Sequence, residues 1–209
     1  MLKFDGLHPV GEHELEAAAE MLNEAFGDDA SFREMLVYEK DDIEMTPLFY
    51  AILKSGLKEG GVIVKDSPEM KGLGMIVPMG IKKPLFSDVS FSAFWRVFKR
   101  YKLRTFFLMG KVNFYMQKMH AKLIDGPHYY LALLGVRPEF QGQGIGKKIL
   151  KSIHKLADNE GKHFYLETQN MKNVSIYRKY GYELLKIDKK YSSKIGEFYF
   201  MLRQPQSNS

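Results

Sequence analysis

Three glycines at alternate positions mark the segment Gln141-Gly142-Gln143-Gly144-Ile145-Gly146. Glycine lacks a Cβ atom, so the backbone of this segment can turn sharply and approach a ligand closely. An apolar run of strand length, residues 129–136, precedes the segment, and apolar residues recur at helical spacing from Ile145 onward. A glycine turn between a strand and a helix presents backbone N–H groups at the positive end of the helix dipole. Such a turn suits a phosphate or pyrophosphate, and Lys147 and Lys148 add charge just past it.

The spacing of the glycines separates this turn from two common nucleotide-binding motifs. The dinucleotide fingerprint G-x-G-x-x-G is not met, because the glycines lie at 142, 144 and 146. A P-loop is not met either, since Gln141 stands where its first glycine belongs and Lys148 replaces the magnesium-binding Ser or Thr. The pattern that is met is Q/R-x-x-G-x-G/A.

This pattern, placed between a strand and a helix, resembles the acetyl-CoA motif of the GNAT N-acetyltransferase superfamily. A second segment supports the resemblance: residues 163–168 are predicted to form the next strand, and residues 173–182 resemble the family's short helix with its N-x-x-x-Y-x-K-x-G-[FY] ending. The two segments cover about residues 129–190. The string L-G-V-x-P-x-x-Q-G-x-G-x-G looks most similar to the branch of puromycin-type antibiotic acetyltransferases.

The resemblance implies a site for acetyl-CoA. The turn from Gln141 to Lys147 would hold the pyrophosphate, and the pantetheine arm would run along the strand at Leu134 and Val136, where the family's sheet opens. The Val136 amide would also donate to the thioester oxygen; the alternative is an ordinary ladder residue. Asn173 would either hydrogen-bond the pantetheine arm or cap the helix that begins there.

Two further residues are candidates for proton transfer. Tyr177 aligns with the family's tyrosine near the CoA sulfur and could protonate the departing thiolate; the alternative is a packing residue. Glu167 lies at the end of its strand on the expected acceptor side. It could relay a proton from the amine through water, or it could pair with a lysine or accept backbone N–H bonds.

Composition restricts the classes of protein. A chain of 209 residues with 45% hydrophobic and 27% charged residues is ordinary for one globular domain, which we expect over residues 1–203 with a frayed tail at 204–209. The chain has no cysteine, which excludes a disulfide framework, a thiolate metal site and a cysteine nucleophile. Its six histidines lack metal-ligand spacing, so no metal is expected. No signal peptide or long apolar segment is evident, so a cytoplasmic location is expected.

The remaining periodicities indicate elements that would position the site. Residues 2–9 are predicted as a first strand, 12–26 as a helix ending at Gly27, and 31–38 as a short helix. Thr46 and Pro47 are predicted as the N-cap and first residue of a helix ending near Gly56. Residues 61–64 and 72–78 are predicted as a hairpin. The expected fold is a mixed, mostly antiparallel, twisted α/β sheet with helices on both faces, which is the GNAT architecture.

Residues 89–124 differ from the rest of the chain in charge. They hold eight basic residues and no acidic one; without these eight, the 31 basic residues of the chain fall to 23, against 25 acidic ones. The region is also rich in aromatic residues, and Phe91, Phe94, Trp95 and Phe98 have the spacing of an amphipathic helix. Three interpretations are open: the aromatics enter the core, they line the acceptor pocket, or the region contacts nucleic acid or a membrane.

Together these patterns predict acetyl transfer from acetyl-CoA to the amine of a small molecule by direct attack. The alternatives are a protein or peptide N-acetyltransferase, and a non-catalytic acetyl-CoA-binding module that uses its basic region to bind a partner. A small-molecule enzyme should have an aromatic pocket built partly from residues 91–120, whereas a protein acetyltransferase should have an open groove. Neither nucleic acid nor membrane is expected as a partner, and a homodimer is left open.

Overall fold

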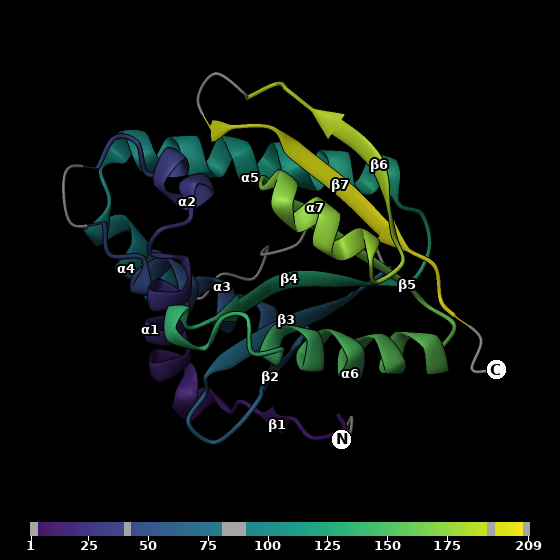
Figure 1. Ribbon diagram of the computed structural model, residues 1–209. Helices are drawn as coiled ribbons and strands as arrows, with labels where there is room; N and C mark the ends of the chain where they lie inside the picture. The colour runs from purple at the N-terminus through teal and green to yellow at the C-terminus, as the bar shows by residue number, and fades with distance from the viewer. Residues whose placement is uncertain (1–3, 40–42, 81–90, 192–194, 207–209) are drawn as a thin grey trace.

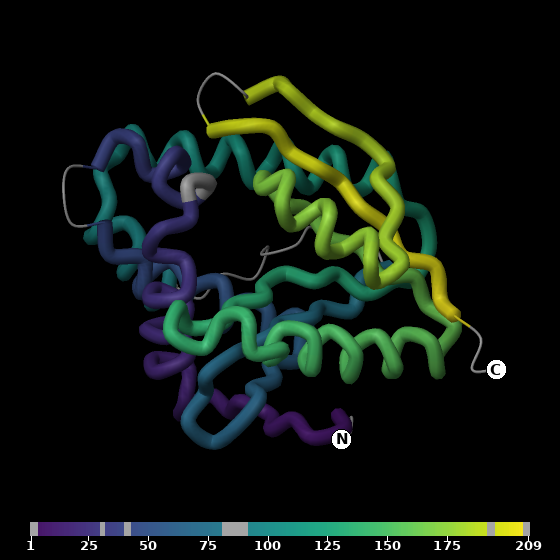
Figure 2. Tube along the Cα trace, viewed as in Figure 1, coloured from purple at the N-terminus to yellow at the C-terminus, as the bar shows by residue number. Residues whose placement is uncertain are grey.

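The computed structural model describes residues 4–39, 43–80, 91–191 and 195–206 (Figure 2). Seven strands form one sheet: β1 (His8–Pro9), β2 (Val62–Lys65), β3 (Gly72–Met79), β4 (His128–Val136), β5 (His163–Thr168), β6 (Tyr182–Asp188) and β7 (Phe198–Arg203). The helices are α1 (Leu15–Phe26), α2 (Ala30–Met35), α3 (Thr46–Lys58), α4 (Phe91–Arg100), α5 (Leu103–Leu123), α6 (Ile145–Asn159) and α7 (Met171–Arg178). The described residues also include two short 3₁₀ turns, η1 (Glu12–Glu14) and η2 (Pro138–Phe140).

The strands lie in the order β1-β2-β3-β4-β5-β7-β6, and every neighbouring pair is antiparallel except β4 with β5. Figure 1 shows β7 and β6 rising away from β4, with α7 between the two halves of the sheet. The single parallel pair is where the two halves meet.

Helices cover both faces of the sheet. On one face α6 and α7 pack on β4 and β5 through a cluster that includes Ile149, Ile153, Phe164, Leu166 and Val174. On the other face α1 and α3 cover β2, β3 and β4, with α4 packed on α3, while α5 covers β5 and β7. The alternation of side chains along β5 therefore sends Phe164 and Leu166 toward α6 and α7, and Tyr165 and Glu167 toward the other face.

Two glycines of β3 allow α6 to approach the sheet closely. A Cβ atom on Gly72 would lie 2.5 Å from Ile145 Cγ2, and one on Gly74 would lie 2.7 Å from Ile149 Cγ2. Both distances are shorter than van der Waals contact, so larger residues would push the start of α6 away. The two glycines thus set the position of the glycine turn that precedes α6.

The predicted mixed sheet with helices on both faces is confirmed, as are the 61–64 and 72–78 hairpin, the helix ending at Phe26 and the strand at 163–168. Several boundaries were wrong. The short helix predicted at 31–38 is α2, Ala30–Met35, because the chain forms turns at residues 36–38. The first strand is only His8–Pro9, and residues 1–3 lie outside the described residues. The N-cap of α3 is Met45, because Thr46 is already the first residue of the helix; the Met45 N–H donates to Asn23 Oδ1 at 2.8 Å. Helix α7 begins at Met171, with Asn170 as its cap.

The expected frayed tail falls partly outside the described residues. Residues 207–209 are not described, but the Gln206 N–H donates to Asp158 Oδ1 at 2.8 Å. The same carboxylate receives a bidentate pair from Arg203, at 2.6 and 2.8 Å, so residues 203–206 follow the end of α6 closely. None of the described helices is long and apolar enough to cross a membrane.

Buried histidines make the stability of the fold depend on pH. His154 is buried, its Nε2 lies 2.9 Å from the Tyr182 hydroxyl, and burial lowers its pKa to about 3. Between about pH 3 and 6.5 the unfolded chain binds a proton that the folded chain does not, so acid favours unfolding. We expect the free energy of unfolding to fall by up to about 1.4 kcal/mol per pH unit for this residue below pH 6.5. Thermal unfolding of wild type and His154→Gln across this range should show a shallower slope for the variant.

The exposed His8 provides the matched control, because His8→Gln removes a histidine from the surface. Equal slopes for wild type and His154→Gln would contradict the assignment of a neutral, buried His154.

Candidate active site

The sheet splits between β4 and β5. Their paired register covers only His128–Tyr130 of β4 and His163–Tyr165 of β5, although both strands continue beyond it. The N–H of Arg137 donates to the Lys71 carbonyl at 2.9 Å, toward β3. Because successive N–H groups of a strand alternate between its two edges, those of Leu134 and Val136 face the split. A β-bulge at Ala132, between the pairs Ile76–Leu131 and Met75–Leu133, marks the same point on the β3 side.

The glycine turn follows directly from β4. Gly142 and Gly144 have φ of +77° and +84°, and a Cβ atom at either would meet nothing within 4 Å. Gly144 is the N-cap of α6, and the first helical hydrogen bond runs from Lys148 N–H to Gly144 C=O at 2.9 Å. The N–H groups of residues 145–147 precede that bond, so they have no acceptor within the helix. They form a polar cradle with open space in front of it, which fits a pyrophosphate.

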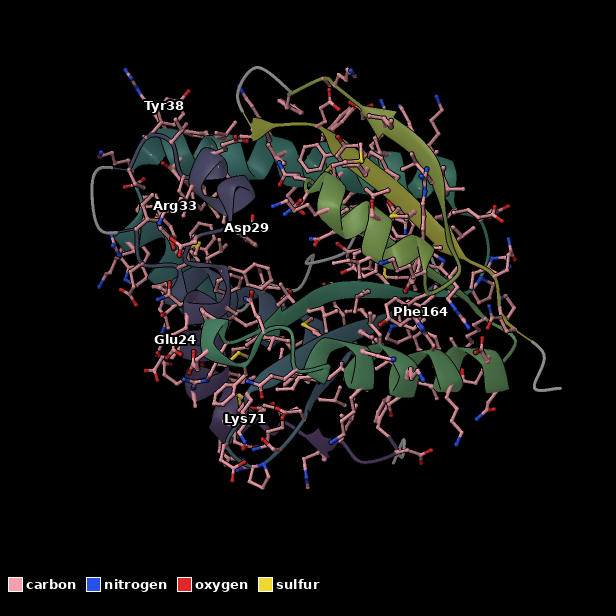
Figure 3. The ribbon with its side chains drawn as sticks, viewed as in Figure 1. Glu24, Asp29, Arg33, Tyr38, Lys71 and Phe164 are labelled. Carbon is pink, nitrogen blue, oxygen red and sulfur yellow. The ribbon has the colours of Figure 1, made fainter. Side chains whose placement is uncertain are left out.

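Neighbouring side chains hold this turn. Gln141 Nε2 donates to the Val136 carbonyl and Gln143 Nε2 donates to the Glu139 carbonyl, each at 3.1 Å. Arg137 contacts Glu24 of α1 at 2.5 Å; Figure 3 labels Glu24 and Lys71 on this side of the molecule. Lys147 and Lys148 are both exposed, but Lys148 Nζ turns away from the turn and donates to the Asp66 carbonyl at 3.1 Å. Lys147 is therefore better placed than Lys148 to meet an anion at the turn.

A cavity of about 500 Å³ passes through the split. Its walls come from α1, α2, α3, α4, α5, β4, β5, α7 and β7, and most of them are apolar. The aromatic lining residues are Phe26, Phe32, Phe94, Phe106, Tyr130, Tyr177 and Phe198. Two carboxylates, Asp29 and Glu167, also line it, and Figure 3 shows Asp29 beside α2. The volume is that of a small-molecule site, and the carboxylates suit a cationic group.

Glu167 is held by two tyrosines. Its Oε2 accepts from the Tyr130 hydroxyl at 2.7 Å and its Oε1 accepts from the Tyr165 hydroxyl at 2.9 Å. Burial raises the pKa of Glu167 to about 7, although both hydroxyls oppose that rise because they stabilise the carboxylate. A carboxylate of this pKa, in contact with the cavity, can accept a proton near neutral pH. The alternatives of a lysine partner or backbone N–H donors were wrong, because these partners are tyrosine hydroxyls.

Two histidines lie behind the tyrosines. His120 stacks on Tyr165 with ring centroids 4.2 Å apart, and its Nε2 lies 2.7 Å from His128 Nε2. His128 Nδ1 lies 2.9 Å from the Gly126 carbonyl, which can only accept, so His128 Nδ1 donates and its Nε2 accepts from His120. Burial lowers the pKa of both rings. This neutral pair contributes no positive charge near Glu167, which is consistent with the raised pKa of the carboxylate.

Helix α7 places Asn173 and Tyr177 four residues apart on the side that lines the cavity. Burial raises the pKa of Tyr177 to about 12, so the phenol carries its proton at neutral pH. Asn173 Nδ2 donates to Thr168 Oγ1 at 3.3 Å, and the suggestion that Asn173 caps the helix was wrong because Asn170 does so. Tyr182 is buried and Tyr180 packs on the same core cluster.

The structure brings the predicted residues into one region: Leu134, Asn173, Tyr177 and Glu167 all line the cavity, and Val136 leads to the turn. The sequence did not single out Tyr130 or Tyr165, which hold Glu167, nor Phe26, Phe32 and Asp29. The sequence shows two adjacent tyrosines at 129 and 130. A strand buried on both faces has no polar–apolar alternation, so the sequence does not indicate which of the two side chains faces the site.

Residues 105–184 match the family model described as an acetyltransferase (GNAT) domain. Among curated proteins, an uncharacterized N-acetyltransferase of Schizosaccharomyces pombe is 25% identical over 147 residues. That match covers 66% of this chain and 57% of the relative, so the chain spans little more than half of that relative's length.

Solved structures of similar fold cover nearly the whole chain. Arylalkylamine N-acetyltransferase 2 of Aedes aegypti has a TM-score of 0.67 at 12% identity, covering 96% of this chain and 98% of its own. Naa20 of Chaetomium thermophilum, in complex with a bisubstrate analogue, has a TM-score of 0.54 at 13% identity, covering 95% and 85%. At such identities these structures bear on the fold alone. Residues 105–184 are thus similar to a GNAT acetyltransferase domain, and the fold of the chain is similar to that of solved N-acetyltransferases.

Proposed function

We propose that this protein transfers the acetyl group of acetyl-CoA to the primary amine of a small molecule that has an apolar or aromatic body. The observation that carries the proposal is the cavity that joins the backbone N–H groups of the β4–β5 split to Glu167. The cradle at residues 142–147 has the open space and the N–H groups that a pyrophosphate needs. Acetyl-CoA, when bound, supplies the acetyl group as a thioester.

The chain supplies the groups that this reaction needs. The Val136 N–H donates to the thioester oxygen, which stabilises the charge that develops there. Glu167 accepts a proton from the attacking ammonium group, directly or through a water, so that the nitrogen lone pair can form the C–N bond. Tyr177 donates its proton to the sulfur as the C–S bond breaks. The nitrogen loses its second proton as the amide forms, and this proton returns to the Tyr177 phenolate through water. No covalent bond to the enzyme is formed.

The lining of the cavity supports a small apolar amine as the acceptor. Its aromatic walls and two carboxylates suit an ammonium group on an apolar body, and α4 and α5 contribute Phe94, Phe106 and Asn113 to it. One of the structural relatives is named an arylalkylamine N-acetyltransferase, which agrees with this chemistry. The resemblance to puromycin-type enzymes suggests an aminonucleoside as a second small-molecule acceptor.

A peptide acceptor is the second candidate function. It is favoured by the likeness to Naa20, whose structure contains a bisubstrate analogue. The two candidates differ in what should fill the cavity: a whole small molecule, or the first residues of a chain.

Release of the CoA thiol tests the proposed function. We expect release from acetyl-CoA with arylalkylamines and long-chain alkylamines, and little release with short peptides that begin with Ser, Ala or Met. Faster release with the peptides would favour the second candidate. Release with neither class, in a protein that binds acetyl-CoA, would favour a non-catalytic module.

Tyr177→Phe tests the proposed acid. We expect turnover to fall by about 10- to 100-fold, at or below the low end for general acid catalysis, because a thiolate is already a fair leaving group. Affinity for acetyl-CoA, measured by calorimetry, should change little, since the phenol contacts only the sulfur in this scheme. Unchanged turnover would remove Tyr177 as the acid. Tyr180→Phe, on the same helix end but absent from the cavity lining, is the matched control.

A further inference from the structure

Helices α4 and α5 expose several aromatic side chains. These side chains would be buried if the aromatic residues of this region entered the core. Phe94, Trp95 and Phe98 of α4 are 39–42% exposed, whereas Tyr101, just after that helix, is buried. On α5, Leu103, Phe107 and Phe114 are 57%, 59% and 72% exposed. Most of the region therefore departs from the interpretation in which its aromatics enter the core.

These side chains form one continuous surface, which we call the aromatic–basic face. Phe98 contacts Trp95, at 5.6 Å between ring centroids, and Phe106, at 5.7 Å, and Phe106 in turn contacts Phe107 at 6.2 Å. From Phe107 the surface continues along α5, because Lys111, Phe114 and Lys118 follow at intervals of four, three and four residues. The face thus alternates apolar rings with positive charges.

The charge on this face is almost free of internal compensation. Lys111 and Lys118 are exposed, and no ion pair is recorded for either among the described residues, while Lys99 lies 5.3 Å above the Trp95 ring. Arg96 and Arg100 differ, since they contact Glu16 and Glu44. No acidic residue occurs between residues 89 and 124. The face is therefore complementary to a negatively charged partner that also accepts apolar side chains.

We propose that the aromatic–basic face binds the surface of an anionic lipid bilayer. Helices with Trp, Phe and Leu on one side and Lys or Arg beside them lie in the membrane interface, with apolar side chains among the acyl chains and cations at the headgroups. A second copy of the chain is disfavoured, because a two-fold contact would place like charges against each other. A nucleic acid duplex is disfavoured too, since its phosphate backbone offers nothing to Leu103 or Phe114.

The position of the face has a consequence for the acceptor. Phe94 and Phe106 belong both to this surface and to the cavity wall, so the cavity lies directly beside the face. If the proposed function also holds, an apolar amine dissolved in the bilayer can reach the cavity without passing through water. Membrane binding itself does not depend on acetyl transfer, and its test below requires no activity.

Flotation with lipid vesicles tests the proposal. We expect wild-type protein to float with phosphatidylcholine vesicles that contain about one third phosphatidylserine, and not with phosphatidylcholine alone. Lys111→Gln/Lys118→Gln should weaken binding about 30-fold, since each cation contributes about fivefold near such a surface. Phe107→Gln/Phe114→Gln should weaken it at least as strongly, with little change in thermal stability because both rings are exposed.

Matched controls change the same properties elsewhere. Lys58→Gln/Lys151→Gln removes two exposed lysines from α3 and α6, and Leu185→Thr/Ile187→Thr removes exposed apolar groups from β6. Both should float like wild type. The proposal is overturned by a wild-type protein that does not float with anionic vesicles, or by Lys111 and Phe107 variants that float as well as the controls. Release from the vesicles by equimolar duplex DNA would assign the face to nucleic acid. A dimer lost on Phe107→Gln/Phe114→Gln would assign it to a second copy.

Discussion

Replacing Gly144 with aspartate is expected to abolish acetyl-CoA binding. Gly144 has φ of +84°, which aspartate tolerates better than most residues, and its Cβ would point into open space rather than into the protein. The new carboxylate would stand in the cradle that we assign to the pyrophosphate. Two unit charges 4 Å apart repel by about 4 kcal/mol near a protein surface, and solvent screening reduces this. A loss of affinity of at least about 100-fold, or 2.7 kcal/mol, follows.

Gly144→Asn is the matched control, because asparagine has nearly the same size and the same tolerance of positive φ. Calorimetric titration with acetyl-CoA should rank wild type above the Asn variant and the Asn variant well above the Asp variant. Aspartate and asparagine variants of equal affinity would show that the pyrophosphate does not lie at this turn.

Replacing Glu167 with glutamine is expected to lower turnover by about 10²- to 10⁴-fold, the range for loss of a general base. Glutamine keeps the size of the side chain. Its carbonyl oxygen can accept from one of the two tyrosine hydroxyls and its NH2 group can donate to the other, so binding of acetyl-CoA should persist. Because burial raises the pKa of Glu167 to about 7, wild-type turnover should fall as the pH drops below about 7 and the carboxylate becomes protonated. That dependence should be absent in Glu167→Gln. Only the titration of the amine itself should remain.

Tyr130→Phe tests whether Glu167 acts as the general base or has only a structural role. The Tyr130 hydroxyl stabilises the charged form of Glu167, so its removal should raise the pKa further and move the acid limb of the turnover–pH profile to higher pH. Tyr129→Phe is the matched control, because the Tyr129 hydroxyl donates to Glu160 on the other side of β4. This variant should leave the acid limb of the turnover–pH profile in place. A profile with the same limb in wild type and Tyr130→Phe would contradict the role of Glu167.

Elements with a strong local signal were predictable. The helix after the glycine turn follows from the 3.6-residue period that begins at Ile145, and strand β5 was predicted with its observed bounds. The turn itself was predictable because only glycine adopts φ of +77° and +84° at little cost. These features depend on residues close together in the chain.

The arrangement of the site was less predictable because it depends on residues far apart. Glu167 accepts a hydrogen bond from Tyr130 of β4, which is 37 positions away in the sequence. This contact depends on the register of the short parallel β4–β5 pair, and local periodicity does not determine that register. Phe26 and Phe32 line the cavity from α1 and α2, yet in the sequence they have the same pattern as core residues. The exposure of Phe107 and Phe114 was equally hidden, since an amphipathic pattern shows which side chains share a face but not what covers that face.

Thermal unfolding of the wild-type protein, titrated with acetyl-CoA and separately with CoA, tests the donor site most directly. A ligand that binds only the folded state stabilises it by about 2.7 kcal/mol at a concentration of 100 Kd. We expect a clear, concentration-dependent rise in Tm with both ligands, because both carry the pyrophosphate assigned to the turn at residues 142–147. Absence of a shift at millimolar concentrations of either ligand would contradict the proposal that the turn and the β4–β5 split bind acetyl-CoA. It would also contradict the reaction proposed from that binding.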